Sequence, residues 1–306
     1  MSGPRRDEGP GWLAVSHETE RSNFRKLGTS DIVVASFPCS GQFLTGNILL
    51  ELGLNYLTAS SEEFAADGKA YPIPSFYGVR RRFAARDRSD RASTLRRRWP
   101  RFVATHSASR YLDVTSLRGV LLLVRDPRDA LYSQYCLQAA IEGERVSELA
   151  AEGREAAAQG EVTSFDSWLG QPMSLFTEAS LESPVAAWAD YHSEWLDAVD
   201  GDRLFVMRFE DLKKRAAETV RKGLVHFGIQ VAEPDLVKAV ELSSFPAMRQ
   251  HEDAVLRERG AAEGEYRFMR RGLVGEWKQW MTAERAMRFS NRRLQAVASS
   301  LGYAMG

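Results

Sequence analysis

The sequence predicts a three-layer α/β domain whose central sheet is mainly parallel. Two observations carry this prediction: short, wholly apolar runs recur along the chain, and longer amphipathic stretches lie between or after them. Strands buried on both faces of a parallel sheet have such continuous apolar runs, and the amphipathic stretches form helices that cover the two faces. No internal repeat is visible, so we expect one domain, 1–306.

Four runs have the length and composition of buried strands. In chain order they are DIVVAS (31–36), RFVATH (101–106), GVLLLV (119–124) and RLFVMRF (203–209). Four amphipathic stretches are predicted to be helices: SGQFLTGNILLELG (40–53), DPRDALYSQYCLQAAIEG (126–143), SPVAAWADYHSEWLDAVDG (183–201) and FEDLKKRAAETVRKGLVHFG (209–228). Asp126 suits the N-cap of the second helix and Pro127 its first position, and Gly53 suits the end of the first.

Two regions have weaker patterns. Residues 1–30 are polar, and we expect them to form an arm. The segment ELAAEGREAAAQGE (148–161) is rich in alanine and glutamate, and we expect a simple helix or a lid insert there rather than a domain boundary.

Composition argues against several classes of function. The net charge of zero argues against a general binder of nucleic acid or of membrane surfaces. No apolar run approaches the ~20 residues that span a bilayer, the N-terminus shows no secretory signal, and two cysteines cannot form a disulfide framework. We therefore expect a reducing, cytoplasmic compartment. The excess of arginine over lysine and the abundance of alanine suggest a GC-rich bacterial coding sequence.

One segment departs from this charge balance. RRRFAARDRSDRASTLRRRWPR (80–101) is dense in arginine, with only Asp87 and Asp90 opposing. It is either a solvated face of a helix or loop, or a rim that attracts an anionic ligand towards a nearby site.

The carboxyl ends of the predicted strands indicate a ligand crevice, because ligands of parallel α/β sheets bind there. The turn from Pro38 to Gln42, His106, Arg125 and the segment after Phe209 all follow strands. The first turn leads into a helix N-terminus, where free backbone N–H groups and the helix dipole suit a phosphate. Taken alone, this turn is a weak signal, since many strand–helix turns are similar.

A second pair of residues also suits a phosphate. Arg125 ends a strand and Ser133 follows eight residues later inside a helix, so a guanidinium and a hydroxyl could share one anion. The alternative is that Asp126 or Asp129 satisfies Arg125. Further on, two arginines precede Gly272 in a turn that could clamp the same phosphate.

Six segments between Val33 and Thr282 repeat, in order and at similar intervals, the motifs of one known family. They are SFPCSGQFL, ATHSASRYL, LLLVRDPRDALYSQY, FVMRFEDLKK, SSFPAM and FMRRGLVGEWKQWMT. By these segments the chain resembles the cytosolic sulfotransferases, which transfer a sulfuryl group from 3′-phosphoadenosine 5′-phosphosulfate (PAPS) to a hydroxyl or amine. The resemblance implies their P-loop-like fold and PAPS as co-substrate, in a small-molecule enzyme of bacterial type.

The resemblance also implies roles for individual residues. It makes His106 the general base, which suits an imidazole whose usual pKa lies close to working pH. The residues implied to bind PAPS are Cys39, Ser40, Gly41, Gln42, Phe43 and Leu44 in the phosphosulfate loop, Arg125 and Ser133, Ser243 and Phe245 near the adenine, and Arg270, Arg271 and Gly272 in the closing block. The other histidines, His17, His192, His226 and His251, have no such context, and no metal-ligand spacing appears, so we expect no metal.

The sequence departs from the family pattern at the reacting end of the donor. Where the family's loop reads Tyr-Pro-Lys-Ser-Gly-Thr-Thr-Trp, its lysine is replaced by Cys39, its threonines by Gln42 and Phe43, and its tryptophan by Leu44. Ala104 stands where a lysine often precedes the Thr-His pair. The arginines and the serine implied to hold the 3′-phosphate are all present.

Three hypotheses follow from these departures. In the first, the protein is a PAPS-dependent sulfotransferase in which loop N–H groups, Gln42 and an arginine from elsewhere, such as one of the 80–101 run, replace the lysine. In the second, it binds PAPS or its product PAP but has lost or changed the transfer reaction. In the third, Cys39 itself reacts, because a thiol at a helix N-terminus can have a lowered pKa; its alternative is a small buried residue. A P-loop kinase fits poorly, since no G-x-x-x-x-G-K-[ST] sequence is present.

The partner is expected to be a small-molecule acceptor, plausibly a phenol or alcohol of bacterial secondary metabolism, and not nucleic acid or membrane. Aromatic walls for it could come from 71–83, Trp99, Tyr135 and 164–176, within or near an acceptor-side lid insert at about 142–182, although aromatic residues there are equally ordinary core. The family's dimer motif is half present: Lys278 and Thr282 fit, whereas Ala283 and Met287 do not. The oligomeric state is therefore left open.

Overall fold

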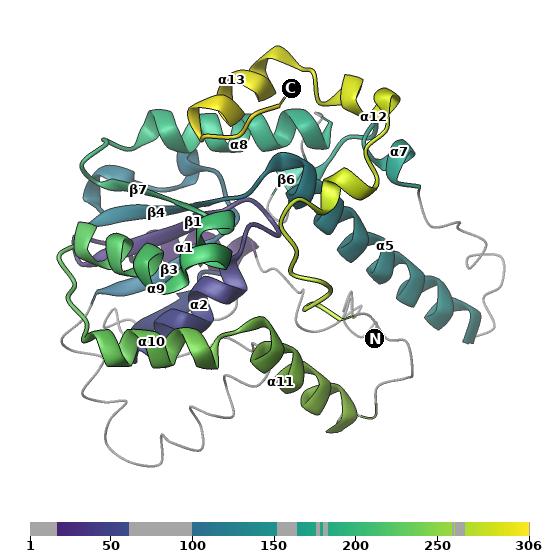
Figure 1. Cartoon of the computed structure of the whole chain (residues 1–306). Helices are drawn as coiled ribbons and strands as arrows, with labels where there is room; N and C mark the ends of the chain where they lie inside the picture. Colours follow the sequence, from purple (N-terminus) through teal and green to yellow (C-terminus); the bar gives the residue numbers. More distant parts are fainter. Residues whose placement is uncertain are drawn as a thin grey trace, which may run out of the picture.

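The computed structural model describes residues 17–60, 100–151, 164–175, 178–179, 183–258, 260 and 267–305 (Figure 1). Its helices are α1 (His17–Phe24), α2 (Gln42–Glu51), α5 (Pro127–Ala151), α7 (Phe165–Trp168), α8 (Pro184–Ala198), α9 (Phe209–His226), α10 (Glu233–Leu242), α11 (Phe245–Glu258), α12 (Ala283–Arg288) and α13 (Arg292–Ser300). Its strands are β1 (Asp31–Ser36), β2 (Asn55–Thr58), β3 (Arg101–Thr105), β4 (Gly119–Val124), β5 (Ser174–Leu175), β6 (Glu178–Ala179) and β7 (Leu204–Arg208). Single 3₁₀ turns cover Ser109–Tyr111, Val114–Ser116 and Glu276–Gln279.

The central sheet has the strand order β2-β3-β1-β4-β7, and all of its neighbouring strands are parallel. This confirms the predicted fold class. The four predicted strands are β1, β3, β4 and β7, while β2 was not among the predictions because four residues are too few to show a pattern. The two-residue strands β5 and β6 form a separate antiparallel pair.

Alternate residues of β1 face two apolar clusters, one on each side of the sheet. Val33 and Ala35 belong to a cluster with residues of α5, α8 and α13, whereas Ile32 and Val34 belong to a cluster with residues of α2, α9 and α10. Figure 1 shows α8 and α13 on one side of the sheet and α2 and α10 on the other. Burial on both faces is the reason that these strands contain no polar alternation.

The predicted helices are present with shifted ends. They are α2, α5, α8 and α9, and α5 continues to Ala151, eight residues beyond the predicted end at Gly143. The first four residues of the 148–161 segment are therefore helical, and the rest of that segment begins beyond the described part of α5. Within the expected N-terminal arm, residues 17–24 form helix α1. None of the helices in the described ranges is long and apolar enough to cross a membrane.

A buried ion pair joins the first residues of the two central strands β1 and β3. The Asp31 carboxylate, fully buried, accepts hydrogen bonds from Arg101 Nε at 2.5 Å and from Arg101 Nη2 at 2.6 Å, and from the Gly28 backbone N–H at 2.8 Å. Asp31 and Arg101 are also paired in the strand register. The ion pair therefore locks the alignment of β1 with β3 at the edge opposite the predicted crevice.

We expect Asp31→Ala to lower the free energy of unfolding by about 3–5 kcal/mol, because it leaves the Arg101 guanidinium without its buried partner. Urea unfolding followed by circular dichroism measures this change. The control is Asp202→Ala on an exposed turn, which should alter the free energy by no more than about 0.5 kcal/mol. Equal unfolding midpoints for the two variants would contradict the structural role of the pair.

Candidate active site

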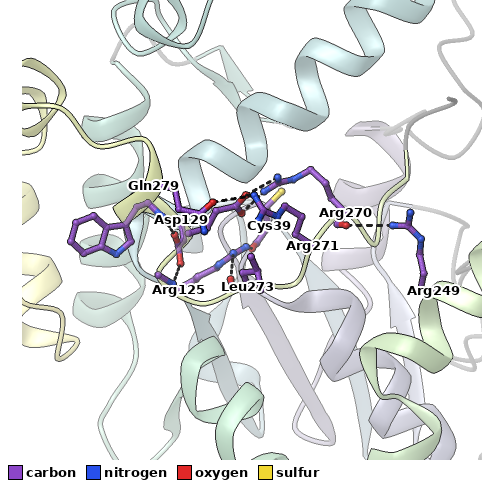
Figure 2. A network of polar contacts seen from close by, with 11 residues as sticks. Cys39, Arg125, Asp129, Arg249, Arg270, Arg271, Leu273 and Gln279 are labelled. Carbon is purple, nitrogen blue, oxygen red and sulfur yellow. Dashed lines mark hydrogen bonds and ion pairs between the residues drawn. The ribbon is translucent and has the colours of Figure 1, made fainter.

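Four strands end at one edge of the sheet, and the residues that follow β1, β4 and β7 are in contact there. Arg125, directly after β4, donates from Nη1 to the Cys39 carbonyl at 3.0 Å and from Nη2 to the Leu273 carbonyl at 3.0 Å (Figure 2). Its guanidinium carbon lies 4.5 Å from the centroid of the Phe209 ring, which follows β7. His106, after β3, is hydrogen-bonded to the last residue of β1, Ser36. The predicted crevice residues are thus brought together.

The turn between β1 and α2 has the geometry of an anion-binding loop. Cys39 has φ 63° and Gly41 has φ 106°, both in the left-handed region. A Cβ atom on Gly41 would lie 2.8 Å from the Phe209 ring, so the position has no room for a side chain. Helix α2 begins at the next residue, Gln42, and no side chain caps it. The first N–H groups of α2 are therefore available for a ligand.

Buried polar atoms in and near this loop have no hydrogen-bond partner within the described ranges. They are Ser40 Oγ, Gln42 Nε2, Thr45 Oγ1, Arg125 Nε and Ser243 Oγ. An unsatisfied buried polar group costs ~1–3 kcal/mol, so such groups rarely gather without a reason. A polar, anionic ligand that reaches both the loop and Arg125 would satisfy them, and the residues present fit such a group.

Asp126 and Asp129, the alternative partners that the sequence left open for Arg125, form their hydrogen bonds with other groups, although the charge of Arg125 acts on the Asp129 carboxylate. Asp126 pairs with Arg128 through two hydrogen bonds of 2.9 and 2.7 Å. Asp129 accepts from the backbone N–H groups of Gly275 and Trp277 at 2.6 and 2.8 Å, and so holds the closing segment against α5. Arg125, 6% exposed, is hydrogen-bonded only to neutral carbonyl groups among the described residues, and its charge stays available to a ligand.

The two arginines of the closing segment share one buried carboxylate, Glu276. Arg270 donates to both Glu276 oxygens, at 2.8 and 2.5 Å, and Arg271 donates to Oε1 at 3.1 Å. Burial by itself would raise the pKa of Glu276, but the two guanidinium groups outweigh it and hold the pKa below its ordinary value. The carboxylate is therefore ionised at neutral pH and neutralises part of the positive charge that the sequence had assigned to a phosphate.

Phe245 connects the start of α11 to the closing turn. Gly272 has φ 60°, and a Cβ there would lie 2.6 Å from the Phe245 ring. On the other side, Lys213 Nζ lies 5.4 Å from the centroid of that ring. Partial burial and the charge of Arg125 lower the pKa of Lys213, so several cations surround this point of the crevice.

His106 is held in a defined tautomer. Its Nδ1 lies 2.6 Å from the Ser36 carbonyl, and a carbonyl can only accept, so Nδ1 carries the proton and Nε2 carries the lone pair. Burial lowers the pKa of His106, and the hydrogen bond to Ser36 only partly offsets this effect. The imidazole is consequently neutral at pH 7, which is the state that a general base requires.

Cys39 points towards helix α5. Its Sγ lies 3.6 Å from Gln134 Oε1, and Ser133 is its other side-chain partner. Burial raises the pKa of the Cys39 thiol, and the charges of Arg125 and Arg270 do not overcome this effect. The lowered pKa expected of a reactive cysteine is therefore not found, which favours the alternative of a small buried residue.

Other predicted residues lie at the margins of the crevice or in the core. Phe43 contacts Phe268 of the closing segment, with ring centroids 3.9 Å apart, and Leu44 packs against the apolar cluster of α2. Of the suggested acceptor walls, Phe165 and Trp168 are buried members of the main core. Residues 71–83 and Trp99 lie outside the described residues.

The roles of three polar residues of the site were missed by sequence reasoning, which named Asp129 only as a possible partner of Arg125. Glu276 and Asp129 stand inside quoted motifs, but their roles depend on partners that spacing does not reveal. Lys213 also stands inside a quoted segment, FVMRFEDLKK, and its role likewise depends on partners that spacing does not reveal. Among the described residues, no group of three or more His, Cys, Asp and Glu side chains could hold a metal ion.

Fold and site together define a class: an α/β protein with a parallel sheet, in which the carboxyl ends of the strands form a site that suits an anionic ligand. A family model described as a sulfotransferase domain matches residues 29–299. The chain belongs to the sulfotransferase family.

Individual relatives agree with this assignment. The chain is 24% identical to sulfotransferase 2A6 of Rattus norvegicus over 200 residues, which are 64% of this chain and 63% of the rat protein. It is 27% identical to the 3-alpha-hydroxysteroid sulfotransferase of Cavia porcellus over 180 residues, 57% of this chain and 54% of that protein. The aligned region is thus less than two thirds of the length of these relatives.

Solved structures show the same fold at lower identity. Retinol dehydratase in complex with retinol and PAP has a TM-score of 0.56 at 14% identity, over 95% of this chain and 91% of that chain. Mouse sulfotransferase SULT7A1 complexed with PAP has a TM-score of 0.56 at 16% identity, over 93% and 90%.

We expect both thiols to react slowly with iodoacetamide at neutral pH, because burial raises the pKa values of Cys39 and Cys136 above the ordinary 9.0. Mass spectrometry of labelled protein, with the Cys39→Ala and Cys136→Ala variants to separate the sites, measures each rate. Labelling should accelerate only above pH 9.0, or when urea unfolds the chain. Rapid labelling of Cys39 in the folded protein at neutral pH would contradict the raised pKa and support the hypothesis that Cys39 is reactive.

Proposed function

We propose that this protein transfers a sulfuryl group from PAPS to a hydroxyl, or an amine, of a small molecule, with His106 as general base. The observation that carries the proposal is the hydrogen bond from His106 Nδ1 to the Ser36 carbonyl. It leaves the lone pair on Nε2 and holds the imidazole at the same sheet edge as the loop before α2 and Arg125, in a chain of the sulfotransferase family.

The donor-binding residues fall into three groups in this proposal. The unsatisfied polar atoms of Ser40, Gln42 and Arg125 support a ligand that spans the loop and the end of β4. The first N–H groups of α2 suit the 5′-phosphosulfate. Contacts to the 3′-phosphate would come from Arg125, Ser133, Arg271 and Gly272, and contacts on the adenine side from Ser243 and Phe245. Arg270, which the sequence also assigned to the 3′-phosphate, would instead face the reacting end.

The chemical step needs a base and a stabilised leaving group. PAPS supplies the sulfuryl group: the bond from sulfur to the bridging oxygen of the 5′-phosphate breaks as the acceptor oxygen bonds to sulfur, and PAP leaves with the bonding electrons. His106 Nε2 takes the proton of the acceptor hydroxyl, while Nδ1–H stays bonded to Ser36. Sulfuryl transfer resembles phosphoryl transfer in its loose transition state, so positioning and charge stabilisation dominate the rate.

Arg270 is our candidate for the cation that the loop lysine supplies elsewhere in the family. Its charge lies close enough to lower the pKa values of the Cys39 and Cys136 thiols against the effect of burial. Its guanidinium carbon lies 5.4 Å from the centroid of the Tyr132 ring, next to Ser133 on α5. The sequence also suggested the arginine-rich run 80–101 as a source. Residues 80–99 of this run lie outside the described residues, and its last arginine, Arg101, is engaged by Asp31.

A second candidate function is a PAP- or PAPS-binding homologue that has lost or changed the transfer reaction. The observation that favours it is Cys39 itself, a half-buried thiol with a raised pKa, and therefore protonated at neutral pH, in the place of the family's loop lysine. Retinol dehydratase, one of the similar solved structures, carries a different reaction name with PAP bound.

The acceptor and the cellular compartment are part of the same proposal. The acceptor is a small molecule, and a hydroxylated product of bacterial secondary metabolism fits the composition and the family. Androsterone and retinol occupy similar solved structures, so an apolar alcohol is a sensible first acceptor to test. We place the protein in the cytoplasm.

Calorimetry with PAP, followed by transfer of radiolabelled sulfate from PAPS to a panel of phenols, alcohols and amines, tests the proposal. We expect wild type and His106→Gln to bind PAP alike, and His106→Gln to lose transfer by about 10²–10⁴-fold. Because burial lowers the pKa of His106 below the ordinary 6.5, the rate should rise with pH through a midpoint below 6.5 and stay level at pH 7.

The outcomes separate the two functions. Tight PAP binding without transfer to any acceptor in the panel would support the binding homologue, and no PAP binding would refute both. Full activity in His106→Gln would remove the proposed base.

A rescue experiment tests the role of Arg270. Arg270→Gln should lower kcat by about 10²–10³-fold, the usual loss of a charge-stabilising group, and adding Cys39→Lys should restore much of it. The matched control is Arg271→Gln, which removes the neighbouring charge: it should weaken PAP binding, and Cys39→Lys should not rescue it. Equal rescue of both variants would show that Arg270 has no special place at the reacting end.

A further inference from the structure

Helix α1 lies ahead of the matched sulfotransferase domain, yet it places a buried carboxylate beside His106. The Glu20 side chain is 3% exposed, and its two oxygens accept hydrogen bonds from different residues. Oε1 accepts from Thr105 Oγ1 at 2.6 Å, and Oε2 accepts from Ser107 Oγ at 2.9 Å. One carboxylate therefore bridges the two residues that flank His106 in the chain.

The segment that carries His106 is further tightened from within. The Ser107 backbone N–H donates to Thr105 Oγ1 at 2.9 Å, so the threonine hydroxyl both accepts from Ser107 and donates to Glu20. The three residues Thr105, His106 and Ser107 thus form a small closed loop. Glu20 supports it from outside, together with the Trp195 indole, whose Nε1 donates to the Ser107 carbonyl at 3.3 Å. The imidazole projects from the middle of this loop.

A second residue of α1, Asn23, docks the helix at the end of β2. Asn23 Nδ2 donates to the Ala59 carbonyl at 2.7 Å, and the Ala59 N–H donates in turn to the Ala104 carbonyl of β3 at 2.9 Å. Asn23 is fully buried, as Glu20 nearly is. Two residues on one face of α1 therefore bind different parts of the protein. Asn23 attaches α1 to the end of β2, and Glu20 binds the turn after β3.

Packing alone does not explain a buried carboxylate at this helix interface. Removing such a group from water is unfavourable unless hydrogen bonds compensate it, and well-packed apolar residues stabilise a helix interface at least as well. What a carboxylate adds is direction, because two oxygens in a fixed plane hold two hydroxyl donors at a fixed separation. Here that separation spans the proposed catalytic base.

We propose that Glu20 is a positioning residue for His106. By holding Thr105 and Ser107, it keeps the imidazole in the orientation in which Nδ1 donates to Ser36 and the lone pair lies on Nε2. This inference rests on the proposed function of His106 as base. Loss of the bridge would let the ring move, and a misplacement of about 1 Å can cost about 10²-fold in rate.

The test compares Glu20→Ala, Glu20→Gln and the matched control Asn23→Ala. Glu20→Ala should lower kcat by about 10–100-fold and leave the Kd for PAP within about twofold, because the donor site lies on other segments. In the pH–rate profile of Glu20→Ala, the midpoint of the rise at low pH should move up towards the ordinary histidine pKa of 6.5, because an imidazole that leaves its buried position loses the effect of burial on its pKa. Glu20→Gln keeps an acceptor for one hydroxyl, folds if Glu20→Ala does not, and should recover most of kcat.

Asn23→Ala decides between positioning and simple docking of α1. We expect it to destabilise the protein without changing kcat by more than about twofold or moving the midpoint of the pH–rate profile. Equal losses of kcat in Asn23→Ala and Glu20→Ala would show that Glu20 only docks the helix, and so would an unchanged kcat and pH profile in Glu20→Ala.

A measurement without turnover separates this inference from the proposed function. ¹⁵N NMR of the imidazoles reports which ring nitrogen carries the proton, and His106→Gln identifies the His106 signal among the five histidines. Wild type should show protonated Nδ1, and Glu20→Ala should show a mixture of tautomers. If wild type transfers no sulfate but this shift is seen, positioning stands and the proposed reaction fails; if the tautomer is unchanged, positioning is overturned.

Discussion

The guanidinium of Arg125 is the group on which the site depends. It lies buried at the end of β4 and joins two segments that are 86 and 148 residues away, through the carbonyl groups of Cys39 and Leu273. Neutral carbonyls position the guanidinium without cancelling its charge, and the Phe209 ring covers it at 4.5 Å. The same residue therefore assembles the crevice and keeps it positive, which is what an anionic ligand requires.

The carboxylates around the site have different partners. Acidic residues close to Arg125 are engaged elsewhere: Asp126 by Arg128, and Asp129 by the backbone of the closing segment. Glu276 instead forms ion pairs with both Arg270 and Arg271. A phosphate that bound to these arginines would compete with an internal carboxylate. Cys39 stands where the family's loop has a lysine, so in the proposed reaction the neighbouring arginines would have to stabilise the leaving group.

His106 is supported from several elements rather than by its own strand alone. Ser36 of β1 fixes its tautomer, and Glu20 of α1 bridges its two neighbours. On the far side, Glu194 of α8 accepts from Ser109 Oγ at 3.0 Å and from the Arg110 N–H at 2.7 Å, which anchors the following turn. A functional group on a short loop is held accurately only when its neighbours are locked by packing and hydrogen bonds. The chain meets this requirement with carboxylates from two helices.

The sequence by itself predicted most of the helices and strands of the described fold and many of the residues of the candidate site. Apolar runs identified four of the five strands of the central sheet, and motif order indicated the loop at Cys39, His106 and Arg125 before any coordinates, because parallel strands end at one edge. The short distance along the chain from the end of β4 into α5 also relates Arg125 to Ser133. What only the tertiary structure decided was pairing: that Arg125 binds carbonyls rather than Asp126, that Glu276 neutralises two arginines, and that Glu20 braces a segment 85 residues away. Helix and strand periods record which face of an element is buried, but they carry no record of which distant side chain meets it there.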